Sequence, residues 1–155
     1  MDVEIIAGRW PEDLERLLAG LPEWFGIDAS VADYVESART LPSLAAVHNG
    51  EVVGLCVVRH HNPFASEIEV LAVRRDLHRK AIGRRLLDRV ERDLREHGAL
   101  LLQVKTRGPS APSSEYERTR AFYEAVGFIP LEERGDIWGA EDPCLIMVKP
   151  LGRAR

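Results

Sequence analysis

The stretch from Leu71 to Leu87 constrains the fold most, because an apolar strand there runs into a basic turn that at once begins a helix. The first turn of a helix leaves backbone N–H groups without partners and carries roughly half a positive charge, so it favours an anion such as a pyrophosphate. Small residues at Ala81 and Gly83 leave room for that anion beside the amides. Cationic side chains crowd the turn, and Asp76 alone opposes them: Arg74, Arg75, Arg79, Lys80, Arg84 and Arg85. The stretch predicts a phosphate-binding turn, although a basic helix start by itself is also typical of a solvated surface.

A second stretch, from Thr119 to Phe128, predicts a helix that ends and passes straight into a strand. Gly127 suits the left-handed position that follows a helix, and an apolar extended run begins at Phe128. Between Gly83 and Tyr123 there is room for one helix, one strand and one loop.

The two stretches together resemble motifs A and B of the GNAT superfamily, the acyl-CoA-dependent N-acyltransferases. Motif A runs Gln/Arg-x-x-Gly-x-Gly/Ala. Its three anchor positions here hold His78, Ala81 and Gly83, so the first two depart from the pattern. Motif B has Phe-Tyr followed by Gly-Phe, and the second stretch matches both pairs. The resemblance covers residues 49–149, which is most of the chain.

At 155 residues the chain has the length of one domain, and no linker, repeat or low-complexity segment divides it. We therefore expect a single domain over residues 1–155, of the α/β class, with a mixed sheet covered by helices on both faces. The resemblance implies the GNAT fold, a mostly antiparallel six- to seven-stranded sheet. Its fourth and fifth strands splay apart and admit the pantetheine arm of the cofactor.

The apolar patterning gives the expected elements, and the tail after Pro150 is expected to be frayed. Strands are predicted over residues 3–7, 43–48, 51–60, 67–73, 100–106, 128–133 and 144–149. Helices are predicted to begin at Pro11, to cover residues 30–37, to run from Ile82 to His97, and to cover residues 116–126.

The composition limits the classes of function. A formal net charge of −4 argues against a general nucleic-acid binder, which needs a basic excess to neutralise phosphates. No stretch approaches the ~20 apolar residues of a membrane span, and the first residues lack the pattern of a signal peptide. We therefore expect a cytoplasmic protein with no membrane or nucleic-acid partner. Cys56 and Cys144 lie in apolar runs and are expected to be buried and unpaired. The adjacent His60 and His61 point to opposite faces of their strand, so no metal site is predicted.

The resemblance implies acetyl-CoA as the acyl donor. Amides around the basic turn would hold its diphosphate, and exposed backbone groups on the preceding strand would pair with its pantetheine arm as an added strand does. An amide on this strand, such as that of Val73, would also polarise the thioester carbonyl. The predicted cofactor-binding residues are Leu71, Ala72, Val73, His78, Arg79, Lys80, Ala81, Ile82, Gly83 and Arg84.

Catalysis needs a proton for the departing thiolate and a group that takes the proton of the amine, whose pKa of ~10.4 keeps it protonated at pH 7. Tyr123 matches the general acid usual in the family, and the alternative is an aromatic of the core. Glu67 and Glu69 are the candidate general bases, expected on one face of their strand with Leu71 and Val73. Burial there would raise the pKa of a carboxyl group. The alternative for both glutamates is a solvated strand end.

The acceptor pocket is less constrained. Glu23, Trp24 and Phe25 lie in a connection that covers the acceptor side in this family, and exposed aromatic rings beside an acid suit an amine with an apolar body. The alternative is a hydrophobic contact that only holds the loop. Asparagine is common in the family where Tyr116 stands here, and the Pro-rich loop from Arg107 to Glu115 suggests a longer lid.

The sequence thus predicts a GNAT N-acetyltransferase that moves an acetyl group from acetyl-CoA to a primary amine of a small molecule or peptide, by direct attack in a ternary complex. The alternative is a non-catalytic acyl-CoA-binding regulatory module of the same fold. A P-loop nucleotide-binding domain is excluded, since no G-x-x-x-x-G-K-[ST] motif occurs. The identity of the amine, the length of the acyl group and the choice between the two glutamates stay open. A homodimer is possible, because dimers are common among relatives.

Overall fold

The structure is a computed structural model that describes residues 1–152. Each predicted strand and helix is present in it, with ends that differ by a few residues. In chain order the elements are β1 (Glu4–Gly8), α1 (Pro11–Ala19), α2 (Asp28–Thr40), β2 (Ser43–His48), β3 (Glu51–Asn62), β4 (Ala65–Val73), η1 (Arg75–Leu77), α3 (Ile82–Glu96), β5 (Leu101–Arg107), α4 (Ser114–Ala125), β6 (Ile129–Arg134) and β7 (Cys144–Pro150).

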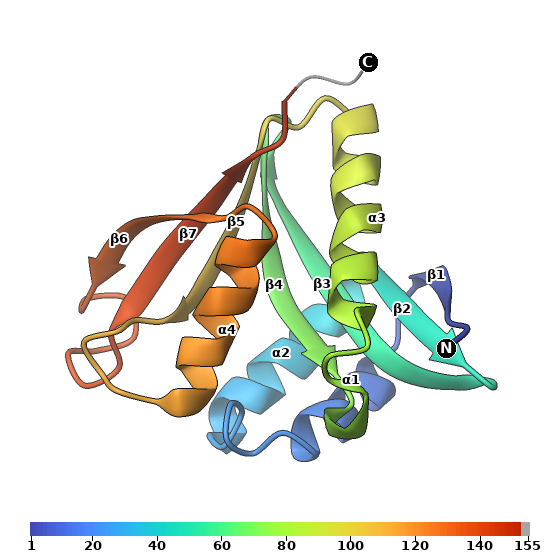
Figure 1. The fold of residues 1–155 in the computed structure, drawn as a ribbon, viewed down its shortest axis with the longest axis horizontal. Coiled ribbons are helices and arrows are strands. Elements are labelled where there is room, and N and C mark those ends of the chain that lie inside the picture. Colours follow the sequence, from blue (N-terminus) through green and yellow to red (C-terminus); the bar gives the residue numbers. More distant parts are fainter. Residues whose placement is uncertain (153–155) are drawn as a thin grey trace.

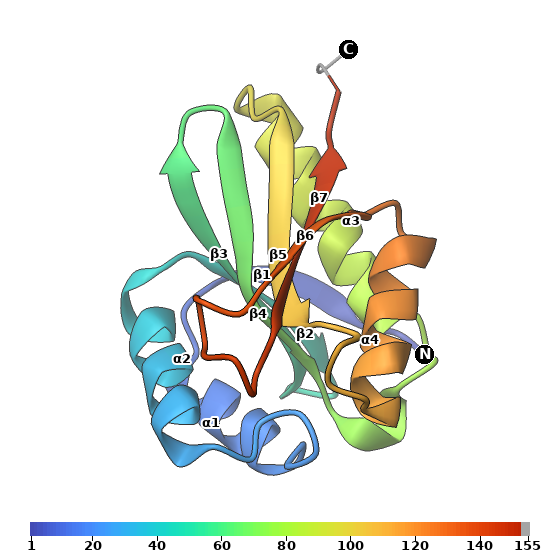
Figure 2. The same cartoon turned by 90° about the vertical axis from the view of Figure 1, so that its left-hand side faces the viewer.

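The seven strands form one sheet in the order β1-β2-β3-β4-β5-β7-β6. Neighbouring strands are antiparallel except β4 and β5, which run parallel. Figure 1 shows α3 and α4 in front of the sheet, and the turned view in Figure 2 shows α1 and α2 on its other side. This arrangement confirms the mixed sheet with helices on both faces and the GNAT fold.

Each face of the sheet has its own hydrophobic core. On one face the apolar stripe of α3 packs with residues of α4 and of the central strands. On the other face Leu14, Leu17 and Leu18 of α1 pack against Val57 and Val70 of the sheet. Full burial of one such side chain contributes about 1.5–3 kcal/mol, so the amphipathic pattern accounts for the position of both helix layers.

Turns with left-handed backbone lie where the sequence predicts them. Asn49 and Gly50 have φ of 51° and 77°, as a two-residue turn of type I′ between β2 and β3 requires. Gly127 has φ of 102° just after α4, so the predicted helix end is confirmed. The buried, unpaired state of Cys56 and Cys144 is also confirmed.

The register of β4 corrects the predicted faces of its glutamates. Val58 pairs with Ile68 and Val57 with Val70, which leaves Glu69 as an extra residue in a β-bulge. Beyond the bulge the side chains change face. Leu71 and Val73 therefore pack on the α3 side, whereas Glu69 contacts Ser37 of α2. The prediction that the glutamates share a face with Leu71 and Val73 is wrong, because alternation holds only in a regular strand.

The end of the described chain differs from the expectation of a frayed tail. Leu151 is buried, its N–H donates to the Leu100 carbonyl at 2.8 Å, and its carbonyl accepts from Arg95 at 2.7 Å. The remaining part of that prediction, residues 153–155, lies outside the described residues. Over residues 1–152, none of the helices has both the length and the apolar character needed to cross a membrane.

Candidate functional site

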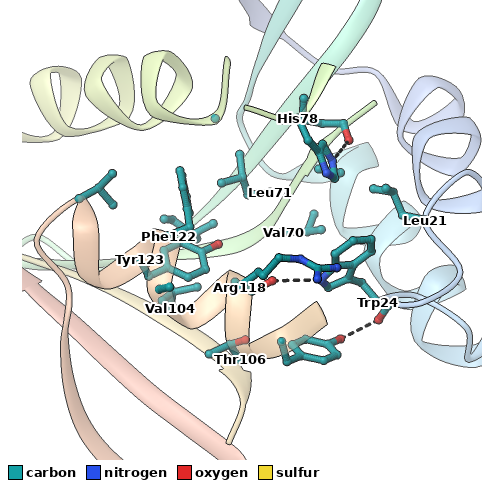
Figure 3. Close-up of a pocket in the computed structure, with 18 of the residues that line it drawn as sticks. Leu21, Trp24, Val70, Leu71, His78, Val104, Thr106, Arg118, Phe122 and Tyr123 are labelled. Carbon is teal, nitrogen blue, oxygen red and sulfur yellow. Dashed lines mark hydrogen bonds between the residues drawn. The ribbon is translucent and has the colours of Figure 1, made fainter. Parts of the chain in front are cut away.

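A cavity of about 830 Å³ opens where β4 and β5 separate. These strands pair only from Ala65–Leu101 to Ile68–Val104, and beyond that point they diverge (Figure 1). The close-up in Figure 3 shows Val70 and Leu71 of β4 on one side of the cavity, with side chains of β5, of α4 and of the α1–α2 connection around it. The splay predicted by the resemblance is confirmed, and it brings most of the predicted site residues to one cavity.

The start of α3 forms one end of this cavity. Ala81 precedes the helix in the left-handed region with φ of 62°, and Arg79 has φ of 67°. No side chain caps this helix end, and its first turn has no acidic residue. The N–H groups at the start of the helix therefore stay available, and the helix dipole favours an anion there. We call residues 79–84 the cradle.

Gly83 keeps the cradle close to α4. A Cβ on Gly83 would lie 3.3 Å from the Phe122 ring and 4.0 Å from Leu71. This contact is tighter than an ordinary van der Waals contact, so a side chain at this position would press on Phe122. Gly83 therefore favours the close packing of α3 on α4 as well as access to the amides.

The cationic side chains of the turn divide into two groups. Arg74 pairs with Asp76 and Glu51, Arg75 pairs with Glu23, and Arg85 donates to the Val3 carbonyl. The other three, Arg79, Lys80 and Arg84, form no ion pair within residues 1–152, although Arg84 donates a long hydrogen bond of 3.4 Å to the Ala125 carbonyl. Two of these, Arg79 and Arg84, line the cavity. Both cations of the turn that line the cavity are thus free of ion pairs, whereas Lys80 does not line it.

The backbone of β4 presents polar groups to the splay. The Arg74 N–H donates to the Val53 carbonyl at 2.9 Å, so residues 72 and 74 bond to β3. In an antiparallel pair the intervening residues point the other way, which turns the backbone groups of Leu71 and Val73 toward the cavity. His78 Nε2 donates to the Val73 carbonyl at 2.8 Å, so that acceptor is already engaged. The backbone of Ala72 faces β3, so the predicted cofactor residue Ala72, which lines the cavity, is not one of those that offer backbone groups to it.

Tyr123 lies on α4 at the same cavity. Its side chain is 5% exposed and packs edge to face with Phe122 and Phe128. Burial raises the pKa of the Tyr123 hydroxyl. No hydrogen bond joins this hydroxyl to another group within the described chain, and it borders the space between α4 and β4 in Figure 3. The residue is thus both a member of the core and a donor that faces the cavity.

Glu69 lines the cavity but does not have the predicted raised pKa. Arg59 donates to both of its oxygens, at 2.9 Å from Nε and 3.2 Å from Nη2, and Ser37 Oγ lies at 3.2 Å. The hydrogen bonds from Arg59 lower the pKa of the carboxyl group and outweigh the effect of its burial. The expectation of a raised pKa is wrong for Glu69, because Arg59 reaches it from the neighbouring strand β3, a partner that strand pairing alone decides.

Glu67 is 5% exposed and is absent from the lining of the cavity. His61 Nε2 donates to its Oε1 at 2.7 Å and Gln103 at 3.0 Å, while Lys105 Nζ lies 3.4 Å away. His60 instead bonds Ser66, so the two histidines do point to opposite faces. The solvated strand end, which was the alternative for both glutamates, is therefore wrong for Glu67.

The predicted acceptor residues separate in the structure. Trp24 and Phe25 line the cavity, whereas Glu23 pairs with Arg75 outside it. Trp24 Nε1 donates to Thr119 Oγ1 at 3.0 Å and to the Glu115 carbonyl at 3.3 Å. Trp24 therefore holds the α1–α2 connection against α4 while it lines the cavity, and its role in binding an acceptor stays a prediction.

Several lining residues were missed by the sequence analysis. Arg118 precedes Phe122 by four positions and so lies on the same face of α4. This helical spacing could have been read from the second motif. Tyr34 and Trp138 come from α2 and from the β6–β7 connection, and no local pattern relates them to the site. We call the part of the lining remote from the cradle the far wall, formed by Phe25, Tyr34, Thr106, Arg107, Tyr116 and Trp138.

Within the part of the chain that the structure describes, no group of three or more His, Cys, Asp or Glu residues is placed to hold a metal ion.

The search of the curated proteins found no match. Solved structures match over the whole fold. A GNAT-family protein from Desulfovibrio desulfuricans has a TM-score of 0.81 at 20% identity, with 97% of this chain and 100% of that one covered.

Two further solved structures share the fold at a similar level of sequence identity. The ribosomal-protein-S18-alanine N-acetyltransferase from Escherichia coli has a TM-score of 0.76 at 18% identity, covering 99% of this chain and 97% of that one. A GNAT family acetyltransferase from Elizabethkingia anophelis with acetyl-CoA bound has a TM-score of 0.71 at 19% identity, covering 96% of this chain and 97% of that one. At the level of sequence, the model of the acetyltransferase (GNAT) family matches residues 8–128, and the chain therefore belongs to this family.

Proposed function

We propose that the protein transfers an acetyl group from acetyl-CoA to a primary amine of a small molecule or peptide, with both substrates bound at once. The observation that carries this proposal is the single cavity at the β4–β5 splay. It joins an uncapped helix start, with unpaired arginines beside it, to an otherwise unbonded tyrosine hydroxyl. An anionic thioester donor and an amine would meet between these two features.

The cradle fits the diphosphate of the donor. The amides of Ile82, Gly83 and Arg84 begin α3, and no side chain competes for them. The side chains of Arg79 and Arg84 add positive charge beside them. Along β4, the N–H and carbonyl of Leu71 and the N–H of Val73 offer the edge to which an extended arm can add as a strand.

Tyr123 would assist the departure of the sulfur. In the transfer, the amine nitrogen bonds to the acetyl carbon, the carbon–sulfur bond breaks, and the thiolate needs a proton. Because burial raises the pKa of Tyr123 above that of a thiol, its hydroxyl stays protonated at neutral pH and would stabilise the departing thiolate as a hydrogen-bond donor. Its edge-to-face packing against Phe122 and Phe128 fixes the direction of that donor.

The proton of the amine has a less direct route. Glu69 is the candidate base, since it lines the cavity and Glu67 does not. Arg59 and Ser37 already occupy its oxygens, so Glu69 would take the proton through water rather than by direct contact. The weak basicity of Glu69 also favours the alternative function, an acyl-CoA-binding module that does not catalyse transfer.

Release of free CoA distinguishes the two functions. We expect calorimetry to detect binding of acetyl-CoA, and a coupled assay to detect CoA release that depends on an added amine. Binding without release across a broad panel of amines would support the regulatory module. Absence of any heat with acetyl-CoA, in folded protein, would exclude both.

A further inference from the structure

The far wall carries hydrogen-bond donors that have no partner. Thr106 is 4% exposed, and its Oγ1 has no hydrogen bond within the described chain. The Nε atom of Arg107 is also buried and makes no hydrogen bond. Asp142 Oδ1 lies 3.5 Å from it, but not in hydrogen-bond geometry. Both residues line the cavity, and Figure 3 shows Thr106 at its border. Buried polar groups are normally bonded, so unbonded ones at a cavity point to a ligand.

Three carboxylates lie near the far wall. Asp142 lies beside Arg107, and the two glutamates of β4 are already engaged. Arg59 and Ser37 bond the oxygens of Glu69. Glu67 has three donors around it, one of which is the cavity-lining Lys105. A ligand cation would therefore find neither glutamate free and would meet Arg107 beside the third carboxylate, Asp142, whereas a ligand anion would find free donors.

Unpaired positive charge adds to these donors. Arg118 lines the cavity and makes no ion pair to any described residue. Arg107 and Lys105 have only the long contacts to carboxylates of 3.5 Å and 3.4 Å. An ammonium group beside such cations has a lowered pKa, so more of it is the neutral, reactive amine.

Aromatic rings form the rest of the far wall. Phe25 packs edge to face on Tyr34 with ring centroids 5.9 Å apart, and Tyr116 and Trp138 line the same space. Burial raises the pKa of Tyr116 to about 12, and the charges of Tyr34 and Asp142 add to this shift, so the Tyr116 phenol stays neutral at pH 7. Such rings suit a flat, apolar ligand body.

We propose that the acceptor is an amine that also carries a carboxylate on an aromatic or apolar body, the chemistry of a hydrophobic amino acid. Arg107 and Thr106 would bind the carboxylate, and the rings of the far wall would hold the side group. This inference rests on the proposed function. It disfavours polycationic acceptors such as aminoglycosides, because they would meet unpaired arginines and occupied carboxylates.

Three matched amines test the proposal with the wild-type protein. L-phenylalanine, its amide and 2-phenylethylamine share the ring and the amino group, and only the first carries the carboxylate. We expect calorimetry, with and without saturating CoA, to show binding of phenylalanine roughly tenfold or more tighter than of the other two, as a charge-assisted contact gives. Equal binding of the three, tighter binding of 2-phenylethylamine, or no binding of any would overturn the proposal.

Variants test which residue causes the preference for phenylalanine over its amide and 2-phenylethylamine. Arg107→Met should remove most of this preference, and Arg107→Lys should retain part of it. Arg92→Met, which removes an exposed charge on α3 without an ion pair, should leave it unchanged. A preference that persists in Arg107→Met would overturn the assignment to Arg107. If acetyl-CoA does not bind, the proposed function is wrong. The amine titrations without CoA would still show whether the carboxylate site exists.

Discussion

The cradle and the far wall form two ends of one cavity, but the chain builds them in different ways. Six consecutive residues, 79–84, supply the cradle, and its polar groups are backbone amides at a helix start. The far wall takes side chains from α2, from the end of β5, from α4 and from two connections. The backbone groups of the cradle are positioned by local conformation, whereas the side chains of the far wall are positioned by the packing of distant segments. The cradle, which we propose as the donor end, is thus fixed by the fold, whereas the far wall, which we propose as the acceptor end, can vary with single side chains.

Tyr123 lies where the two ends meet, and its loss should have the largest effect. Tyr123→Phe removes the hydroxyl that we propose assists the departing sulfur and keeps the ring, so we expect kcat to fall by roughly 100-fold or more. Calorimetry should find the affinity for acetyl-CoA within about twofold of wild type, since the cradle is intact. An unchanged turnover would remove Tyr123 from the mechanism.

Gly83→Val tests the donor end by itself. The added side chain would meet the Phe122 ring, forcing α3 away from α4, so we expect a loss of about 1–3 kcal/mol in unfolding free energy and a tenfold or greater loss of acetyl-CoA affinity. Denaturant titration and calorimetry measure the two effects. Gly135→Ala is the matched control, because a Cβ there meets only Ala140 at 3.7 Å. Equal effects in both variants would show that Gly83 has no special role.

Trp138→Ala tests the acceptor end. The side chain is 41% exposed, so its loss should change the unfolding free energy by less than about 1 kcal/mol. We expect KM for the best amine to rise roughly five- to tenfold, through the lost ring contact, with unchanged binding of acetyl-CoA. Steady-state kinetics at saturating acetyl-CoA provides the measurement. A change in acetyl-CoA affinity instead would contradict the division of the cavity into two ends.

The Arg59–Glu69 pair behind the far wall should appear in the pH dependence of stability. The folded-state pKa of Glu69 lies below its ordinary value of 4.5, so the pair stabilises the fold fully above that value. This contribution is lost as the pH falls through the lowered pKa. Arg59→Met should cost about 1 kcal/mol at pH 7 and flatten the acid loss below about pH 4.5, in chemical denaturation at several pH values. The same acid slope in Arg59→Met and Arg92→Met would contradict this account.

Ala81→Gly should have the smallest effect, and it is a gain. Ala81 adopts φ of 62°, where a Cβ is unfavourable, so glycine should stabilise the protein by about 0.5–1 kcal/mol. Thermal denaturation should show the gain, and acetyl-CoA should bind at least as tightly. A loss of stability would mean that the flexibility of glycine outweighs the relief of strain here.

Sequence reasoning was most accurate where one segment suffices. The strand, turn and helix of residues 71–87, the hairpin at Asn49-Gly50 and the helix end at Gly127 all follow from local preferences, and the structure confirms them. It failed at Glu69, because a β-bulge depends on the register of two strands. It also missed Tyr34 and Trp138, since neither lies near a motif in the chain.

The sequence by itself determined the order of elements, the two amphipathic helix layers and the anion-favouring start of α3, because these depend on periodicity and on contiguous residues. Only the tertiary structure decided which carboxylate reaches the cavity, which arginines stay unpaired and which rings line the far wall. Those properties arise from pairs of residues such as Arg59 and Glu69, or Trp24 and Thr119, that are distant in the chain. Their contacts exist only once the whole chain has packed, because burial and charge pairing are set by neighbours in space.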